Sequence, residues 1–420
     1  MSSETNGTST TAPLPSFDLE RLGRIMANGG LDGLVISTPL NMIYLSGYHP
    51  SAPKGDEPPG GAVVLSRHDL QHPIMIAPDI FLSPFLDEPN WIEDLRPIRS
   101  LLVPVSAATE KSEFFRFMPA ARQDSGWVKR AGETFTGSLT DAIRTALKDL
   151  GLASGRVGYD DLRLGAKIAG SLVDVHDAYG LMMLSREVKT APEIEWLREA
   201  TRVNQVAIER TVKSWSRGKT WKELVQTYHS EITELGGWVA DPGGVFFANP
   251  TDGDPAVRLR VESEDFVVQP GTTVMFDCHG TKNQYCWDGG KSWVVEDEPG
   301  RIAKATSEAM SELGRSMNPG VKIAELQEKT MQTFQKMEVP QSEALLTYFH
   351  GLGLSHADVE ALAVDGADPN WTLQDGMVIA AHLLCPGDEK QRCWIEEVFW
   401  IKEGGAEPFF TWGNDPIPTG

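Results

Sequence analysis

The sequence predicts two domains, an α/β domain followed by an α+β domain whose sheet is mostly antiparallel. At 420 residues, the chain is longer than the size at which a single hydrophobic core stops growing. Apolar strand-like segments alternate with helical segments in the first part, which is typical of an α/β layer structure. In the second part, strands punctuated by glycine and proline come in pairs with helices between them. We place the boundary after residue 184.

The first domain is expected over residues 17–184. It follows a Ser/Thr-rich tail, residues 1–16, that we expect to be disordered. Its expected elements, in order, are a helix at 18–30 that ends in two glycines, strands at 31–38, 61–67 and 72–78, a helix at 137–151, a short strand at 156–161 and a helix at 165–173.

The second domain is expected over residues 185–420. It opens with one long amphipathic helix over 185–215, and Pro192 is tolerated because it lies near the start. After it we expect strands at 243–250, 272–280 and 285–295, helices at 301–317 and 322–337, and three apolar segments with embedded polar residues at 348–359, 376–386 and 393–405.

Composition excludes several classes of partner. A net charge of -21 argues against a surface for nucleic acid or an anionic membrane. No apolar stretch approaches the roughly 20 residues that a membrane-spanning helix needs, and the N-terminal segment lacks the features of a signal peptide. Four cysteines are too few for a secreted disulfide scaffold. We therefore expect a cytoplasmic protein whose partner is a small-molecule substrate.

Two aspartates, Asp277 and Asp288, lie in what is otherwise a hairpin of half-buried strands, "VMFDCHGTKNQYCWDGGKSWVV". A buried ionised carboxylate costs several kcal/mol unless it is paired or bound to a metal. Two such residues in one hairpin therefore indicate a cation. The alternative is that both are turn residues, since Asp288 precedes two glycines.

Three further polar residues interrupt apolar segments near the C-terminus. His350 lies in "YFHGLGLS", His382 in "GMVIAAHLLCP" and Glu396 in "CWIEEVFWI". A single histidine in an apolar segment is more often a core residue than a metal ligand. With the two aspartates, however, five such residues lie on five different strands or strand ends, which favours a shared site.

In this order the motifs resemble the creatinase/prolidase/methionine aminopeptidase superfamily, the pita-bread metallopeptidases, over residues 17–412. The resemblance implies a creatinase-like α/β N-terminal domain, a pita-bread catalytic domain with a curved, mostly antiparallel sheet, and a homodimer. It is carried by "LDGLVISTPLNMIYLSGY", "REVKTAPEIEWLREA", "FDCHGTKNQYCWD", "HGLGLSH", "LQDGMVIAAH" and "WIEEVFWIKEGG".

The superfamily holds two divalent ions with the ligand order Asp, Asp, His, Glu, Glu. The resemblance places these roles on Asp277, Asp288, His350, His382 and Glu396, and it departs from the family pattern at His382, where glutamate is expected. With three carboxylates, a site filled by two divalent ions would carry about +1. Imidazole suits iron and zinc better than magnesium. We therefore expect one or two divalent ions per subunit, with iron or zinc favoured and manganese possible.

The sequence also resembles the non-peptidase branch of the superfamily, such as the dimethylsulfoniopropionate lyases. Those enzymes carry a polar ligand two residues after the first aspartate, where this chain has His279. They also share a pattern similar to "YCWDGGKSW", which includes Tyr285. His279 shares a strand face with Asp277 by the period of two, so it is a candidate for an added ligand or a proton shuttle.

Histidines that grip peptides in the superfamily's peptidases are mostly missing here. The position four before His350 is Leu346, and His356 is offset by one from the peptidase spacing. His356, His279 and Tyr285 remain as candidate proton-transfer groups. Arg258 and Arg260 are candidate carboxylate anchors, or else surface charges on a strand.

These observations favour a metal-dependent lyase or hydrolase that acts on a small, carboxylate-bearing, non-peptide substrate. Trp287 and Tyr348 are candidate pocket walls among the aromatic residues near the site. The alternatives are a proline dipeptidase or aminopeptidase, a mononuclear iron enzyme, and a non-catalytic binding protein that kept the fold. Metal content and a proline-dipeptide assay separate them.

Overall fold

The computed structural model describes residues 14–47, 60–81, 90–99, 119–170, 175–239, 245–249, 266–339, 345–358, 368–385 and 393–417. Most of the expected tail, residues 1–16, lies outside these ranges. The chain divides into two compact units, Met1–Ser185 and Arg186–Gly420, and the expected boundary after residue 184 lies next to this division. None of the helices in the described ranges is both long and apolar enough to cross a lipid bilayer.

A mixed six-stranded sheet with the order β4-β3-β2-β1-β5-β6 forms the centre of the first unit. β1 pairs antiparallel with β2 and parallel with β5, and β3 pairs parallel with β4. Every residue of β1 and β2 is buried, as expected for strands in a sheet covered on both faces. The strands are β1 (Gly33–Ile36), β2 (Ala62–Ser66), β3 (Asp69–Pro78), β4 (Asp94–Ile98), β5 (Val157–Tyr159) and β6 (His176–Asp177).

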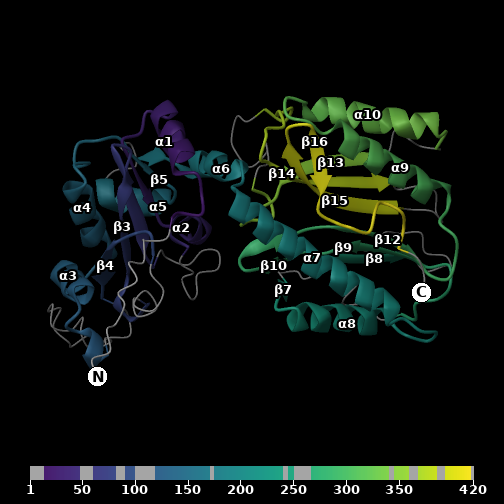
Figure 1. Cartoon of the computed structure of the whole chain (residues 1–420), viewed down its shortest axis with the longest axis horizontal. Helices are drawn as coiled ribbons and strands as arrows, with labels where there is room; N and C mark the ends of the chain where they lie inside the picture. The colour runs from purple at the N-terminus through teal and green to yellow at the C-terminus, as the bar shows by residue number, and fades with distance from the viewer. Residues whose placement is uncertain are drawn as a thin grey trace, which may run out of the picture. The chain divides into compact units, whose positions relative to one another are not determined.

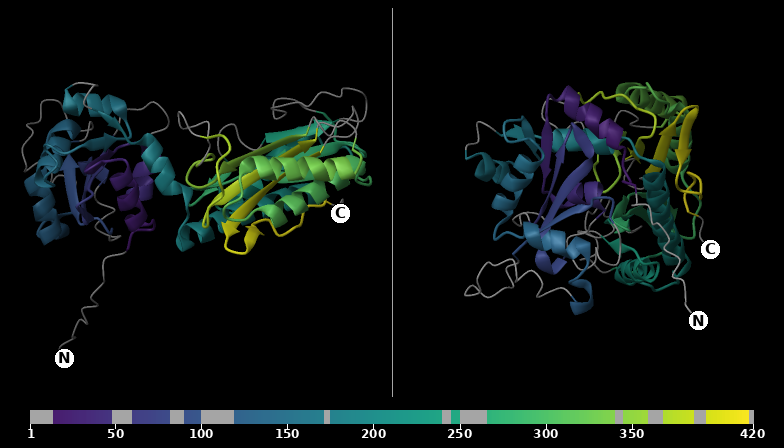
Figure 2. Two further views of the ribbon diagram at one scale, coloured as in Figure 1. Left: turned by 90° about the horizontal axis from the view of Figure 1, so that it is seen from above. Right: turned by 60° about the vertical axis from the view of Figure 1, so that its left-hand side comes forward.

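Helices cover this sheet on both faces, which gives a three-layer α/β unit (Figures 1 and 2). Side-chain caps start several of them: Asp18, Ser138 and Asp161 each accept a hydrogen bond from a backbone N–H of the first turn. The helices are α1 (Leu19–Asn28), α2 (Pro39–Ser46), α3 (Gly126–Thr134), α4 (Leu139–Asp149), α5 (Leu162–Ala169) and α6 (Tyr179–Glu187), with short 3-10 helices at Asp79–Phe81 and Ala120–Arg122.

The expected single helix over 185–215 is wrong, because the structure divides it in two. α6 ends at Glu187 and α7 (Ala191–Lys213) begins after Thr190. Thr190 and Glu193 form a reciprocal capping box, and Pro192 lacks the N–H that a continuous helix would use. Val188, between the two helices, makes an isolated β-bridge with Met377.

The second unit is built on a curved antiparallel sheet with the order β13-β14-β15-β12-β9-β8, and β16 pairs with β15 (Figure 2). A separate small sheet has the order β11-β10-β7. The strands are β7 (Trp238–Val239), β8 (Val245–Asn249), β9 (Thr273–Asp277), β10 (Gly280–Lys282), β11 (Tyr285–Trp287), β12 (Gly290–Val294), β13 (Leu346–Gly351), β14 (Val378–Cys385), β15 (Cys393–Lys402) and β16 (Gly405–Pro408).

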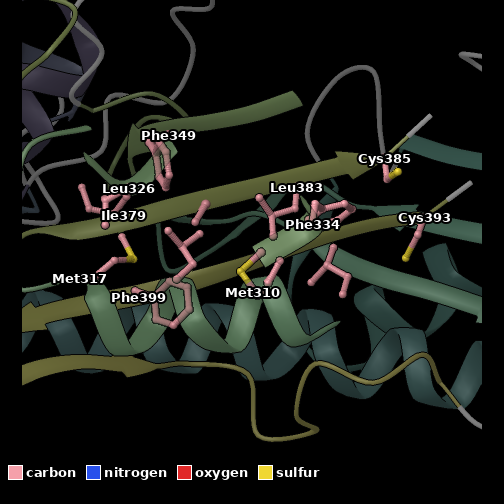
Figure 3. Packing of buried hydrophobic residues seen from close by; sticks show 14 of the residues in the cluster. Met310, Met317, Leu326, Phe334, Phe349, Ile379, Leu383, Cys385, Cys393 and Phe399 are labelled. Atoms are coloured by element: carbon pink, nitrogen blue, oxygen red, sulfur yellow. The ribbon is translucent and has the colours of Figure 1, made fainter. Parts of the chain in front are cut away.

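Two helix pairs pack against one face of the large sheet. α7 packs with α8 (Trp221–Glu234), and α9 (Arg301–Ser316) packs with α10 (Ile323–Lys336). Alternate residues of β14 join the core beneath α9 and α10. They include Ile379 and Leu383, which Figure 3 labels, and Ala381 between them. The residues between them point to the opposite face. The strand period thus assigns one face to the core and leaves the other for polar side chains.

Candidate metal centre

Strand register brings polar residues of the second unit into one row. Tyr348 lies opposite His382, and His382 lies opposite Glu396. Glu396 in turn lies opposite Gly290 at the start of β12. The flanking residues Ala381 and Ile395 belong to the helix-side core, so His382 and Glu396 occupy the face away from the helices.

The glycine pair that follows Asp288 allows this approach of β12 to β15. Gly289 has φ +97°, a conformation that favours glycine, and a Cβ there would lie 3.0 Å from Cγ of Glu396. A Cβ on Gly290 would lie 2.7 Å from the backbone oxygen of Phe276, so close packing against Glu396 explains Gly289 and close packing against Phe276 explains Gly290. The two glycines let Asp288 enter the buried site, where it is wholly inaccessible to solvent.

Four buried side chains converge on one point: Asp288, His350, His382 and Glu396. Nε2 of His382 lies 2.9 Å from Nε2 of His350 and 3.1 Å from Oε1 of Glu396. Nε2 of His350 lies 3.2 Å from Oδ2 of Asp288. These four ligand atoms all lie within 4.8 Å of one another, which is the spacing of ligands around a single ion. We call them the inner group.

The chemistry of the inner group fits a divalent cation. Of the described residues, Asp288 and Glu396 are among those whose buried oxygens have no well-aligned hydrogen-bond donor. Such oxygens are costly to bury unless a cation opposes them. His350 Nδ1 lies 3.1 Å from the Gly351 carbonyl oxygen, which can only accept. Nδ1 therefore carries the hydrogen, and Nε2 keeps the lone pair that binds a metal in the neutral ring.

Protonation within the inner group is strongly uneven. Burial raises the pKa of Glu396 well above its usual value, and the charges of Asp288 and Asp277 raise it further. Burial also acts to raise the pKa of Asp288, but the imidazoles of His279, His350 and His356 outweigh it and hold that pKa well below its usual value. Burial lowers the pKa of His382 to about 4. Carboxylates this close in a dry site repel each other unless positive charge is placed between them.

A second set of three residues, the outer group, shares Asp288 with the inner group. It consists of His279, Asp288 and His356. His279 Nε2 lies 3.2 Å from Oδ1 of Asp288, and His356 Nε2 lies 2.8 Å from Oδ2. The side chains of His279 and His356 are 20% and 47% exposed, so the outer group lies on the accessible side of the centre.

Asp277, at the end of β9, lies beside both groups. Its Oδ1 is 3.1 Å from Nε2 of His279. Burial acts to lower the pKa of His279, but its contacts with Asp277 and Asp288 outweigh this and raise the pKa to about 10. All five residues to which the resemblance gives metal-ligand roles thus lie close together beside the row formed by β13, β14 and β15, along with His279 and His356.

A buried ion triad holds the loop that carries His356. Asp358 accepts a hydrogen bond from Arg186 and one from Lys189 Nζ at 3.1 Å, and all three side chains are almost wholly buried. Ser355 Oγ donates to Oδ1 of Asp358 at 2.8 Å. The positive charges of Arg186 and Lys189 outweigh burial and place the pKa of Asp358 below its usual value. This triad could not be predicted from the sequence, because nothing in the local pattern links residues about 170 positions apart.

Of the other residues that the sequence predicts for the site, one faces the metal centre and two are buried elsewhere. Tyr348 is 42% exposed, and its ring centroid lies 5.2 Å from that of His382, so it faces the centre. Tyr285 is buried, and its hydroxyl donates to Glu193 at 3.2 Å. Trp287 is wholly buried in the core beneath α7 and α8, which leaves it unable to line an open pocket. Arg258 and Arg260 lie outside the described residues.

Comparisons with known proteins agree with this architecture. The family model described as Metallopeptidase family M24 matches residues 195–403. The X-Pro aminopeptidase from Thermotoga maritima MSB8 has a TM-score of 0.68 at 17% identity and covers 94% of this chain and 99% of its own. The Xaa-Pro dipeptidase from Bacillus anthracis has a TM-score of 0.67 at 16% identity and covers 95% of this chain and 98% of its own. Dipeptidase PepE from Mycobacterium ulcerans has a TM-score of 0.66 at 18% identity and covers 96% of each chain. Among curated proteins, none matches.

Proposed function

Because the chain belongs to the creatinase/prolidase/methionine aminopeptidase superfamily of pita-bread metallopeptidases, we propose that it is a metal-dependent hydrolase that cleaves a C–N bond in a small amide or peptide. The observation that carries this proposal is the inner group, in which two imidazoles and two carboxylates with unsatisfied oxygens meet in a buried site. Burying such a set is costly unless a cation opposes the carboxylates, and clusters of residues with strongly shifted pKa values occur mainly at functional sites.

Asp288, His350, His382 and Glu396 would hold the ion. A divalent ion bound there supplies Lewis-acid chemistry, polarising a carbonyl and activating water near neutral pH. Two imidazoles in the set favour iron or zinc, with manganese next. If two ions bind, they bring four positive charges against the three carboxylates Asp277, Asp288 and Glu396, which leaves about +1. That excess favours a substrate that carries a carboxylate.

Side chains on the open side of the centre are placed to meet the substrate. His279 and His356 contact Asp288 from this side, and Tyr348 faces His382 across the row. Tyr348 would form an aromatic wall for the substrate. Tyr285 is not proposed as a proton-transfer group, because its hydroxyl is buried against Glu193. Trp287 is not proposed as a substrate contact.

The substrate class to test first is a dipeptide ending in proline. The structures with the same fold include an X-Pro aminopeptidase and an Xaa-Pro dipeptidase. A second class, non-peptide carboxylates cleaved by hydrolysis or by elimination of a leaving group, is favoured by Leu346. It lies on the same strand face as His350, is 59% exposed, and stands where the superfamily's peptidases have a histidine.

A direct assay tests the proposal. The purified chain, loaded in turn with zinc, iron(II) and manganese(II), is offered Xaa-Pro dipeptides, their C-terminal amides, N-acyl amino acids and carboxylates with a β leaving group. We expect metal-dependent release of amine from at least one amide class, with free acids preferred over C-terminal amides. Asp288→Ala should abolish it, while His229→Ala, on the exposed side of α8, should not.

Two other outcomes would overturn or redirect this assignment. Elimination without amide hydrolysis would overturn the hydrolase assignment in favour of a lyase. Turnover that Asp288→Ala leaves intact would refute the site itself. The homodimer implied by the resemblance is part of the proposal, and the molar mass in solution tests it.

A further inference from the structure

We propose that His279 and His356 are ligands of a second cation, held in the outer group and bridged to the inner one by Asp288. This inference rests on the proposed metal-dependent function, since it assigns ligands within the same centre. It gives the centre four imidazoles, two for each ion, where the superfamily pattern has one histidine ligand. It also removes both histidines from the list of proton-transfer groups.

The first argument is convergence from separate segments. His279 lies between β9 and β10, and His356 lies in the loop after β13. Their rings are nevertheless in edge-to-face contact, with centroids 4.5 Å apart. Both Nε2 atoms point at the same carboxylate, and the three ligand atoms lie within 4.8 Å of one another. Two segments far apart in sequence thus direct the same atom type to one point.

The second argument comes from Asp288. Its two oxygens face three imidazoles at once, with His279 on Oδ1 and with His350 and His356 on Oδ2. Both oxygens are fully buried and are among those without a well-aligned donor in the described part of the chain. A carboxylate with two oxygens can bind two cations at once. One ion in the inner group would leave the imidazoles of His279 and His356, which converge on the same carboxylate, without a metal to bind.

The third argument is the difference in access. The inner group is closed, since the side chains of His350 and Glu396 are 1% and 0% exposed. The outer group reaches solvent through His356. Catalytic metal sites keep an open coordination position, whereas structural sites are closed by protein ligands. The outer position is therefore the more accessible of the two, while the inner position borders the open side at His382, whose side chain is 11% exposed.

The fourth argument is support from the surrounding structure. Metal ligands are held in place by neighbouring hydrogen bonds and packing. The loop of His356 is anchored two residues later, where Asp358 pairs with Arg186 and Lys189. On the other side, Asp277 Oδ1 lies 3.1 Å from His279 Nε2, close enough to bind the same cation.

Zinc stoichiometry tests the inference. The full chain is stripped with a chelator, dialysed against excess zinc chloride, desalted and analysed for zinc per subunit. We expect two equivalents for the wild type and about one for either His279→Ala or His356→Ala. His229→Ala is the matched control and should keep two. Retention of two equivalents by both His279→Ala and His356→Ala would overturn the inference, as would a single equivalent in the wild type.

A cobalt(II) titration gives a second measure of the number of bound ions. The visible absorption of the wild type should rise in two phases, and that of His356→Ala in one. The thermal midpoint of each metal-free variant identifies a variant that has lost its fold. Failure of the two proposals can be told apart: two zinc ions without amide hydrolysis would refute the proposed function alone, whereas hydrolysis with one zinc ion would refute this inference alone.

Discussion

Replacing Asp358 with asparagine should destabilise the second unit by about 3–5 kcal/mol, the usual cost of removing one partner of a buried ion pair. The side chains of Asp358, Arg186 and Lys189 are 2%, 4% and 1% exposed, so solvent does not screen the pair. One carboxylate serves two cations, and the neutral amide would remove the counter-charge that both of them contact. We therefore expect a loss near the upper end of that range.

Urea unfolding followed by tryptophan fluorescence measures the effect, because ten of the twelve tryptophans lie in the second unit. Asp297→Asn is the matched control, since Asp297 is exposed on the same unit. Adding Lys189→Met to Asp358→Asn should recover part of the loss by removing one unpaired buried charge. A loss for Asp358→Asn within about 0.5 kcal/mol of the control would refute the reasoning.

Three more variants probe other contacts. Gly280→Ala would place a Cβ 2.0 Å from Cζ2 of the buried Trp287 ring, so we expect a loss of about 1–3 kcal/mol in urea unfolding, and an unchanged midpoint would contradict this packing. Tyr348→Ala should raise KM about tenfold, equivalent to about 1.4 kcal/mol, without lowering the thermal midpoint, because the ring is 42% exposed; an unchanged KM would exclude it from the pocket. His382→Glu should shift the preference from zinc toward manganese(II) in competition dialysis, and an equal preference would argue that residue 382 does not bind the ion.

Local patterns in the sequence were enough to predict the fold class. The hairpin strands of the second unit and the α/β alternation of the first follow from periodicity and turn residues. The starts of α7 and α8, which were not predicted, are marked in the sequence by capping boxes. The segment starting at Thr220 has the capping box that opens α8, with Glu223 three residues on, and Thr190 with Glu193 marks the start of α7 in the same way.

The site was predictable only in part, because register is a non-local property. The period of two puts His350 on one strand face, but nothing within β13 fixes which residue of β14 lies beside it. The prediction that Trp287 lines the pocket is wrong, because its side chain is buried in the core. An aromatic residue next to Asp288 suggested a pocket wall, yet the bare Gly280 opposite it gives its ring room to enter the core.

The ion triad and the outer group share one loop, so their energetics should be coupled. His356 reaches Asp288 only if the loop keeps its path, and Asp358 fixes that path two residues later. Asp358→Asn, assayed where it remains folded, should therefore weaken the second equivalent of zinc and leave the first intact, since His350 and His382 lie on strands. Zinc titration of Asp358→Asn beside Asp297→Asn measures this. Two equivalents bound with wild-type affinity would show that the triad stabilises the fold without positioning His356.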